Sequence, residues 1–134
     1  MIRISKMTDY AILVMGALAK RPEAILSAAS LASTLRLSVP TVSKILKTLL
    51  LADLVKAMRG SEGGYCLSQP AASITIARVV AAMEGDLAVT ECCESSRLCT
   101  IDSFCALKEN WKKINKMLNV VLSKWTIQDM LKPL

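Results

Sequence analysis

Apolar residues recur along the first twenty positions at the spacing of one helix face. Successive apolar positions lie three or four residues apart, at Ile4, Met7, Ala11, Val14 and Leu18. An α-helix repeats about every 3.6 residues, so these positions share one side of a predicted helix. Pro22 ends that helix, because proline cannot continue the backbone hydrogen-bond ladder.

Two shorter amphipathic helices follow, separated by an interruption at residues 36–38. Ser27 can cap the first helix and Ser38 the second, since a serine hydroxyl accepts a hydrogen bond from an amide of the first turn. Pro40 is tolerated within that first turn. The second helix spans residues 38–50, and its buried face is predicted at Val42, Ile45, Leu46 and Leu49.

The next segments predict a β-hairpin and a further helix. Residues 54–58 and 65–67 have the short alternating pattern of strands, and a glycine-rich turn at 59–64 separates them. A helix is then expected over about residues 73–84, where Gly85 ends it.

The last part of the chain combines an irregular segment with a long helix. Residues 86–104 show no clear period. From about Cys105 onward, apolar residues alternate at spacings of four and three, which is typical of a helix that packs against another helix. Thr126 and Asp129 can form a partial cap for a final helical turn. The heptad positions are Leu107, Trp111, Ile114, Leu118, Val121 and Trp125.

Helix, short turn, helix and hairpin is the order of a winged helix-turn-helix. In that fold, the third helix of the chain, predicted here over residues 38–50, enters a major groove about 12 Å wide. Its outer face must therefore be small, polar or basic. An ordinary solvated helix face is the simpler alternative. The predicted DNA-contacting residues of this helix are Ser38, Thr41, Ser43, Lys44, Lys47 and Thr48.

The turn of the hairpin adds to the case for DNA binding. Arg59 lies at the tip beside Gly60, Gly63 and Gly64, and we assign all four to the DNA interface. Glycines let the backbone turn tightly and approach a partner closely. An arginine at such a tip suits a narrow, electronegative minor groove.

Composition narrows the class of protein. Seventeen Lys and Arg against eleven Asp and Glu give a net charge of +6, which suits a polyanionic partner or describes a merely basic protein. The chain has no histidine, and we find no phosphate-binding loop or defensible carboxylate pair, so we expect no enzyme. The apolar runs are too short to span a bilayer, and we expect a cytoplasmic protein without a membrane partner.

Four of the five cysteines fall within residues 92–105. An odd count in a chain without a visible export signal argues against a disulfide framework. Cys93, Cys99 and Cys105 are each separated by five residues. Thiolates bind both zinc and iron–sulfur clusters, but zinc sites more often use closer pairs, so the spacing favours a cluster. Unligated, reduced cysteines are the third interpretation, and Cys92 is a neighbour that competes with Cys93 as the first ligand.

Three segments together resemble one known family. They are residues 3–11, the Arg-Gly-x-x-Gly-Gly-Tyr wing at 59–65, and the three-cysteine loop followed by Trp111. On these segments the chain resembles the IscR/NsrR-type winged-helix regulators, also called the Rrf-two family. The opening and the cysteine loop are most similar to regulators of the SUF iron–sulfur assembly operon.

The resemblance implies a homodimer that binds double-stranded DNA at a dyad-symmetric operator. It also implies a cluster held by Cys93, Cys99 and Cys105 with a variable fourth ligand. Regulators of cluster assembly place a histidine where this chain has Lys108, a poor ligand while protonated. Some relatives that sense nitric oxide use an acidic residue of the partner subunit, and Asp9 matches it. Glu109 and Cys92 are the local alternatives.

These observations predict an α+β, mainly α protein. We expect a winged helix-turn-helix DNA-binding domain over residues 1–85, a cluster-binding loop over 86–105, and a dimerisation helix with a C-terminal turn over 106–134. The expected function is a repressor that senses iron–sulfur or redox status, through a 2Fe–2S cluster in preference to a 4Fe–4S cluster, and controls cluster-assembly genes. The alternatives are a nitric-oxide-sensing repressor that uses the same cysteines and a small iron–sulfur electron carrier. Asp9 also has a simpler interpretation as an acid at the start of a helix.

Overall fold

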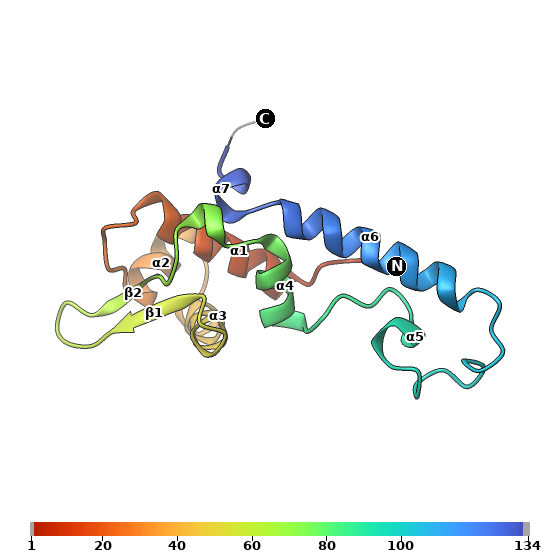
Figure 1. Ribbon diagram of the computed structural model, residues 1–134. Helices are drawn as coiled ribbons and strands as arrows, with labels where there is room; N and C mark the ends of the chain where they lie inside the picture. Colours follow the sequence, from red (N-terminus) through yellow and green to blue (C-terminus); the bar gives the residue numbers. More distant parts are fainter. Residues whose placement is uncertain (1, 133–134) are drawn as a thin grey trace.

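The computed structural model describes residues 2–132 as an elongated molecule with a helical body at one end (Figure 1). The long helix α6 runs away from that body, and α5 with the cysteine-containing loop lies near its far end. In chain order the elements are α1 (Lys6–Lys20), α2 (Ala28–Leu35), α3 (Val39–Leu51), β1 (Val55–Met58), β2 (Gly64–Leu67), the 3₁₀ turn η1 (Ala71–Ser73), α4 (Ile76–Glu84), α5 (Glu91–Glu94), α6 (Lys108–Lys124) and α7 (Ile127–Met130).

Serine hydroxyls fix the starts of the first three helices. Ser5 caps α1 by accepting a hydrogen bond from the Thr8 amide at 3.2 Å. Ser27 caps α2 in the same way at 3.1 Å, and Ser38 caps α3 at 3.3 Å. Such a cap satisfies an amide that has no partner within the helix. The sequence predictions for Ser27 and Ser38 are therefore confirmed.

One hydrophobic core lies between α1, α3 and α4. The four predicted core positions of α3 are all completely buried, as are Ala11 and Val14 of α1. Ile4, predicted on the same stripe, precedes the helix and is 41% exposed. The core residues are Ala11, Val14, Met15, Leu18, Leu31, Ala32, Val42, Ile45, Leu46, Leu49, Leu54, Val55, Ala71, Ile74, Ile76, Val79, Val80 and Ile127.

The predicted hairpin forms an antiparallel pair in which Val55 lies opposite Leu67 and Met58 opposite Gly64. Leu26, before α2, extends the sheet through two backbone hydrogen bonds with Tyr65, at 3.0 and 2.8 Å. This bridge ties the wing to the segment that leads into α2.

Two element boundaries and one helix cap differ from the sequence predictions. The helix expected from residue 73 begins at Ile76, because the Thr75 hydroxyl caps it by accepting from the Arg78 amide at 3.2 Å. The long helix begins at Lys108 and not near Cys105. The C-terminal cap is complete: the Thr126 and Asp129 side chains each accept from the other's backbone amide.

The C-terminal turn returns to the body. Ile127 is fully buried, and its amide donates to the Ile74 carbonyl at 2.9 Å. The helix α7 packs against α1 and η1. The structure thus places this turn in the core of the winged-helix body, although the sequence grouped it with the long helix. Among residues 2–132, none of the helices is long and apolar enough to cross a membrane.

Candidate DNA interface and cysteine loop

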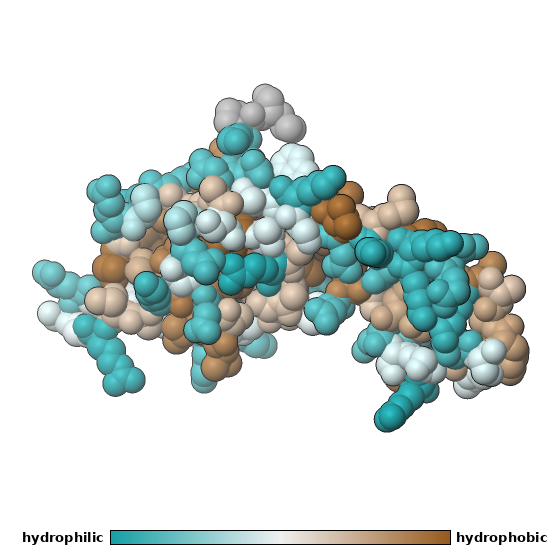
Figure 2. Space-filling model, viewed as in Figure 1, coloured by the Kyte–Doolittle hydropathy of each residue, from teal (hydrophilic) through white to brown (hydrophobic). Residues whose placement is uncertain are grey.

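The outer face of α3 presents two lysines to solvent. Ser43, Lys44 and Lys47 are exposed, and neither lysine forms an ion pair within residues 2–132. Both ammonium groups are therefore available to a polyanion. In Figure 2, hydrophilic side chains project from the wing and from α3 on the same lower side of the molecule, where Figure 1 places both elements.

Three of the four hydroxyls predicted to contact DNA have partners inside the protein. The Thr48 hydroxyl donates to the Lys44 carbonyl at 3.1 Å. Ser38 caps the helix, and its hydroxyl lies 2.7 Å from that of Thr41. Because Ser38 and Thr41 order the start of α3, their contribution to a DNA interface includes positioning the two lysines.

The wing places Arg59 at an exposed tip, and its glycines have separate roles. Gly60 has φ +118° with open space around its α-carbon, so it provides the turn. A β-carbon on Gly63 would lie 2.4 Å from the Met58 carbonyl oxygen, and one on Gly64 would lie 2.5 Å from that of Leu26. Gly63 and Gly64 thus permit close backbone packing within the protein, a reason that the sequence alone did not show.

The turn between α2 and α3 adds a cation that the sequence analysis did not assign. Arg36 caps α2 in a left-handed conformation, with φ 56° and ψ 40°, and its side chain is exposed. Arginine rarely adopts this backbone conformation, so the turn fixes the direction in which the Arg36 side chain leaves the backbone. In the sequence, the only indication of a special role for Arg36 was the interruption of the helical apolar spacing at residues 36–38.

The cysteine loop, residues 86–107, connects α4 to α6. Its four cysteines are half-buried free thiols, as is Cys66 on β2. The Thr90 hydroxyl lies 3.1 Å from the sulfur of Cys92 and 3.2 Å from that of Cys93. Across the described residues 2–132, no three or more Cys, Asp or Glu side chains are grouped closely enough to hold a metal ion. The structure therefore brings Cys92 and Cys93 to one hydroxyl but does not bring Cys93, Cys99, Cys105 and Asp9 together.

Lys108 forms an ion pair inside this loop. Its ammonium lies 2.5 Å from Asp102 Oδ2, and the two side chains are only 21% and 13% exposed. The hydrogen bond to Asp102 raises the pKa of Lys108, with smaller contributions from Glu109 and Cys92. A protonated amine has no lone pair for iron, so the pairing agrees with the prediction that Lys108 is a poor ligand.

Asp102 is a residue that sequence reasoning missed. Its second carboxylate oxygen, Oδ1, is buried and has no hydrogen-bond partner among the described residues. Asp102 lies midway between Cys99 and Cys105 in the chain. That equal spacing was the only signal available in the sequence.

Asp9 lies on the first turn of α1, exposed, at the edge of a groove that the long helix shares. The groove is lined by Asp9, Ile12, Val121, Trp125 and Met130, among others. Val121 is a heptad position of α6, whereas Trp125, the last predicted heptad position, is the extended C-cap residue that follows the helix. Any partner that covers the apolar side of α6 here would therefore also lie beside Asp9.

Long-range hydrogen bonds hold the end of α4 to the start of α1, and the beginning of the cysteine loop to α6. Glu84, at the end of α4, accepts from the Ser5 amide at 2.7 Å and from the fully buried Thr8 hydroxyl at 2.6 Å. These bonds from Ser5 and Thr8 lower the pKa of Glu84. Asn115 of α6 donates to the Leu87 carbonyl and accepts from the Val89 amide, both at 2.9 Å. The loop is thus held to α6 at its beginning, just after the residue that anchors α4 to α1.

The donor set of the loop fits an iron–sulfur cluster in its chemistry. Thiolates are the usual cluster ligands, and a carboxylate is a harder oxygen donor suited to one corner of such a site. The orphaned oxygen of Asp102 also marks a buried polar position that lacks its partner. The thiols would have to converge from their present positions, which a loop without regular structure over most of its length allows.

Comparison with known proteins agrees with this architecture. The family Rrf2, described as an iron-dependent transcriptional regulator, matches residues 4–133. The "Protein aau3" of Rhizobium meliloti (strain 1021) is 32% identical over 132 residues, covering 98% of this chain and 86% of that protein. The solved structure of CymR (YrzC), the global cysteine regulator of B. subtilis, has a TM-score of 0.80 at 30% identity and covers 98% of this chain and 97% of its own. The solved structure of T. potens IscR has a TM-score of 0.74 at 29% identity, and the match covers 97% of this chain and 86% of that chain.

These matches confirm the predicted winged-helix fold and the resemblance to the Rrf-two family. The particular likeness to regulators of the SUF operon stays a prediction. The relatives are transcriptional regulators and not enzymes, as expected from the missing histidine and phosphate loop. This chain belongs to the Rrf2 family of DNA-binding transcriptional regulators.

Proposed function

We propose that this protein is a homodimeric cytoplasmic repressor whose affinity for its operator depends on an iron–sulfur cluster in the cysteine loop. The observation that carries the proposal is the physical connection between loop and reader. The loop begins directly after α4, whose last residue, Glu84, is hydrogen-bonded to the start of α1. A change in the loop can therefore act on the body that positions α3 and the wing. The genes we expect it to control are those of iron–sulfur cluster assembly.

The proposed ligands are Cys93, Cys99 and Cys105, with a carboxylate in the fourth position. Asp9 of the partner subunit is our first choice, because Asp9 borders the groove beside the heptad face of α6. Asp102, Cys92 and Glu109 are the ligands available within the loop or beside it. A bound cluster would supply a centre whose charge and stability change with iron supply, oxidants or nitric oxide. A carboxylate is a harder and weaker ligand for iron than a thiolate, so the iron atom that it binds should be lost more easily. We expect the cluster to be of the 2Fe–2S form.

Dimerisation through α6 explains why this helix has no buried residue although apolar residues repeat along it. Trp111 and Val121 of α6 are 38% and 54% exposed, and Trp125, directly after the helix, is 47% exposed. Figure 2 shows hydrophobic residues on α6 where the helix approaches the body. Large exposed apolar patches mark interaction surfaces. A two-fold dimer would also present two copies of α3 to two half-sites of an operator.

Two alternative signals would use the same thiols. Nitric oxide would react at the same cluster. Regulation linked to cysteine or thiol status, without a cluster, is suggested by the similarity to the global cysteine regulator of B. subtilis and by the separated thiols of the loop.

Anaerobic purification with iron and sulfide analysis and an absorption spectrum separates these possibilities. We expect visible cluster bands in the unmodified protein. The single variants Cys93→Ala, Cys99→Ala and Cys105→Ala should lose them, whereas Cys66→Ala on β2 is the matched control and should keep them. Asp9→Ala and Asp102→Asn should identify the fourth ligand by a shifted spectrum or faster cluster loss. Apoprotein that lacks iron and sulfide after anaerobic reconstitution, yet binds DNA in response to thiol oxidation, would contradict the cluster proposal.

A further inference from the structure

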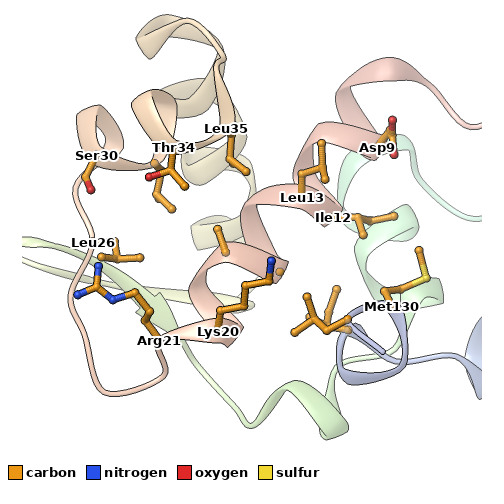
Figure 3. A pocket seen from close by; sticks show the side chains of 15 residues that line it. Asp9, Ile12, Leu13, Lys20, Arg21, Leu26, Ser30, Thr34, Leu35 and Met130 are labelled. Atoms are coloured by element: carbon orange, nitrogen blue, oxygen red, sulfur yellow. The ribbon is translucent and has the colours of Figure 1, made fainter. Parts of the chain in front are cut away.

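A second cavity, of about 320 Å³, lies between α1, α2 and α7 (Figure 3), and it shares Asp9, Ile12 and Met130 with the groove beside α6. Small-molecule sites commonly measure about 300–1,000 Å³ and are mostly apolar with a few polar groups. This cavity has that character. Its walls include Ile12 and Leu13 of α1, Leu35 of α2, and Met130 of α7.

Charged groups are separated along the cavity. Lys20 and Arg21 line one end, and the hydroxyl-bearing residues Ser30 and Thr34 line the α2 side. Figure 3 shows Asp9 at the opposite end, beyond Ile12 and Leu13. Asp9 precedes Lys20 by eleven positions on the same helix, which corresponds to about 16 Å at a rise of about 1.5 Å per residue.

This arrangement fits a particular class of ligand. Two cations and two hydroxyls that line the same cavity can hold an anionic head group by charge-assisted hydrogen bonds. The apolar walls can bury a hydrocarbon body that extends toward Met130. The carboxylate of Asp9 lies too far from the cationic end to cancel it.

The cavity borders two elements of the DNA reader. Its α2 wall is the first helix of the helix-turn-helix unit and packs directly against α3. Leu26 also lines the cavity, and its backbone pairs with Tyr65 of the wing at 2.8 and 3.0 Å. A ligand that contacts Leu26 and α2 would therefore act on both the wing and the recognition helix.

We propose that this cavity binds a small organic anion with an apolar body, such as a medium-chain carboxylate, and that its occupancy changes DNA affinity through α2 and the wing. Asp9 is the one proposed cluster ligand in the cavity, and it lies at the end opposite Lys20 and Arg21, so the anion site itself contains no cluster ligand. Linkage requires that the DNA change the affinity for the carboxylate by the same factor as the carboxylate changes the affinity for DNA.

Octanoate is the probe, and 1-octanol is the control without an anionic head. Calorimetric titration of the full-length protein should show saturable octanoate binding and at least tenfold weaker binding of octanol. The double variant Lys20→Gln/Arg21→Gln should weaken octanoate binding at least tenfold, because both side chains are exposed and can change without disturbing the core. Lys113→Gln/Lys116→Gln on α6 removes the same charge elsewhere and should leave octanoate binding unchanged.

A second variant, Ala17→Leu, fills the cavity from the α1 side and should abolish octanoate binding while circular dichroism stays the same. With operator DNA selected from a randomised pool, octanoate should shift the affinity of the unmodified protein but not that of either cavity variant. The proposal is wrong if octanoate fails to bind saturably, or if it binds both cavity variants as tightly as the original protein. It is also wrong if Ala17→Leu changes only the sedimentation behaviour, since a second copy of the chain would then occupy this space.

Discussion

Replacing Lys44 and Arg59 together by alanine tests the DNA interface directly. The two side chains lie on α3 and on the wing tip, both exposed, so their removal should leave the core intact. The double variant removes two cations per chain, and hence four from a dimer on two half-sites. Each phosphate contact contributes about 0.9 to the slope of log affinity against log salt, so the slope should fall by up to about 3.6.

That change in slope is large enough to measure. Between 50 and 200 mM salt, the unmodified dimer should lose about 150-fold more affinity than the double variant, if all four cations contact phosphates. The assay is fluorescence anisotropy with operator DNA selected from a randomised pool, repeated at several salt concentrations. Lys113→Ala/Lys116→Ala is the control with equal charge. An unchanged affinity and slope in Lys44→Ala/Arg59→Ala, or an equal effect in the control, would refute the assignment of these surfaces to DNA.

Three further perturbations test other parts of the structure. Changing Leu118 and Val121 to aspartate should give soluble monomers with weakened operator binding, and a monomeric unmodified protein in sedimentation at micromolar concentration would contradict the α6 dimer. The pKa of Glu84 is lowered by its hydrogen bonds to α1, so its stabilisation is complete above its unfolded pKa, near 4.5, and is lost as the pH falls through its lower folded pKa. Glu84→Ala should therefore lower the free energy of unfolding by about 1 kcal/mol at pH 7 and reduce its acid dependence in denaturant titrations; identical pH profiles would exclude this role. Gly64→Ala should cost about 1–3 kcal/mol, because the new β-carbon collides with the backbone of Leu26, and an undisturbed melting temperature would show that the wing can move aside.

Local signals in the sequence were sufficient for the reading half of the molecule. The spacing of Val42, Ile45, Leu46 and Leu49 identified the buried face of α3, and all four are fully buried. Ser38 was identified as the helix cap because capping depends on residues three positions apart. The family was recognisable from the wing and cysteine motifs for the same reason, since each motif lies within a short segment.

The tertiary structure decided what depends on residues distant in the chain. The bonds of Glu84 to the start of α1 join positions 79 and 76 apart, and Asn115 holds loop residues 26 and 28 positions away. No periodicity or motif encodes such pairs. Lys108 was recognised as a poor ligand, but its ion pair with Asp102 required the folded loop.

The same distinction between local and distant interactions applies to the C-terminal turn and to the cavity beside it. The sequence determined that residues 126–129 form a capped turn, because that cap is local. Only the fold placed Ile127 in the core against Ile74, and only the fold created the cavity between α1, α2 and α7. Sequence patterns determine which face of an element is apolar, whereas the packing of distant elements determines what that face contacts, because each contact depends on the positions of both partners.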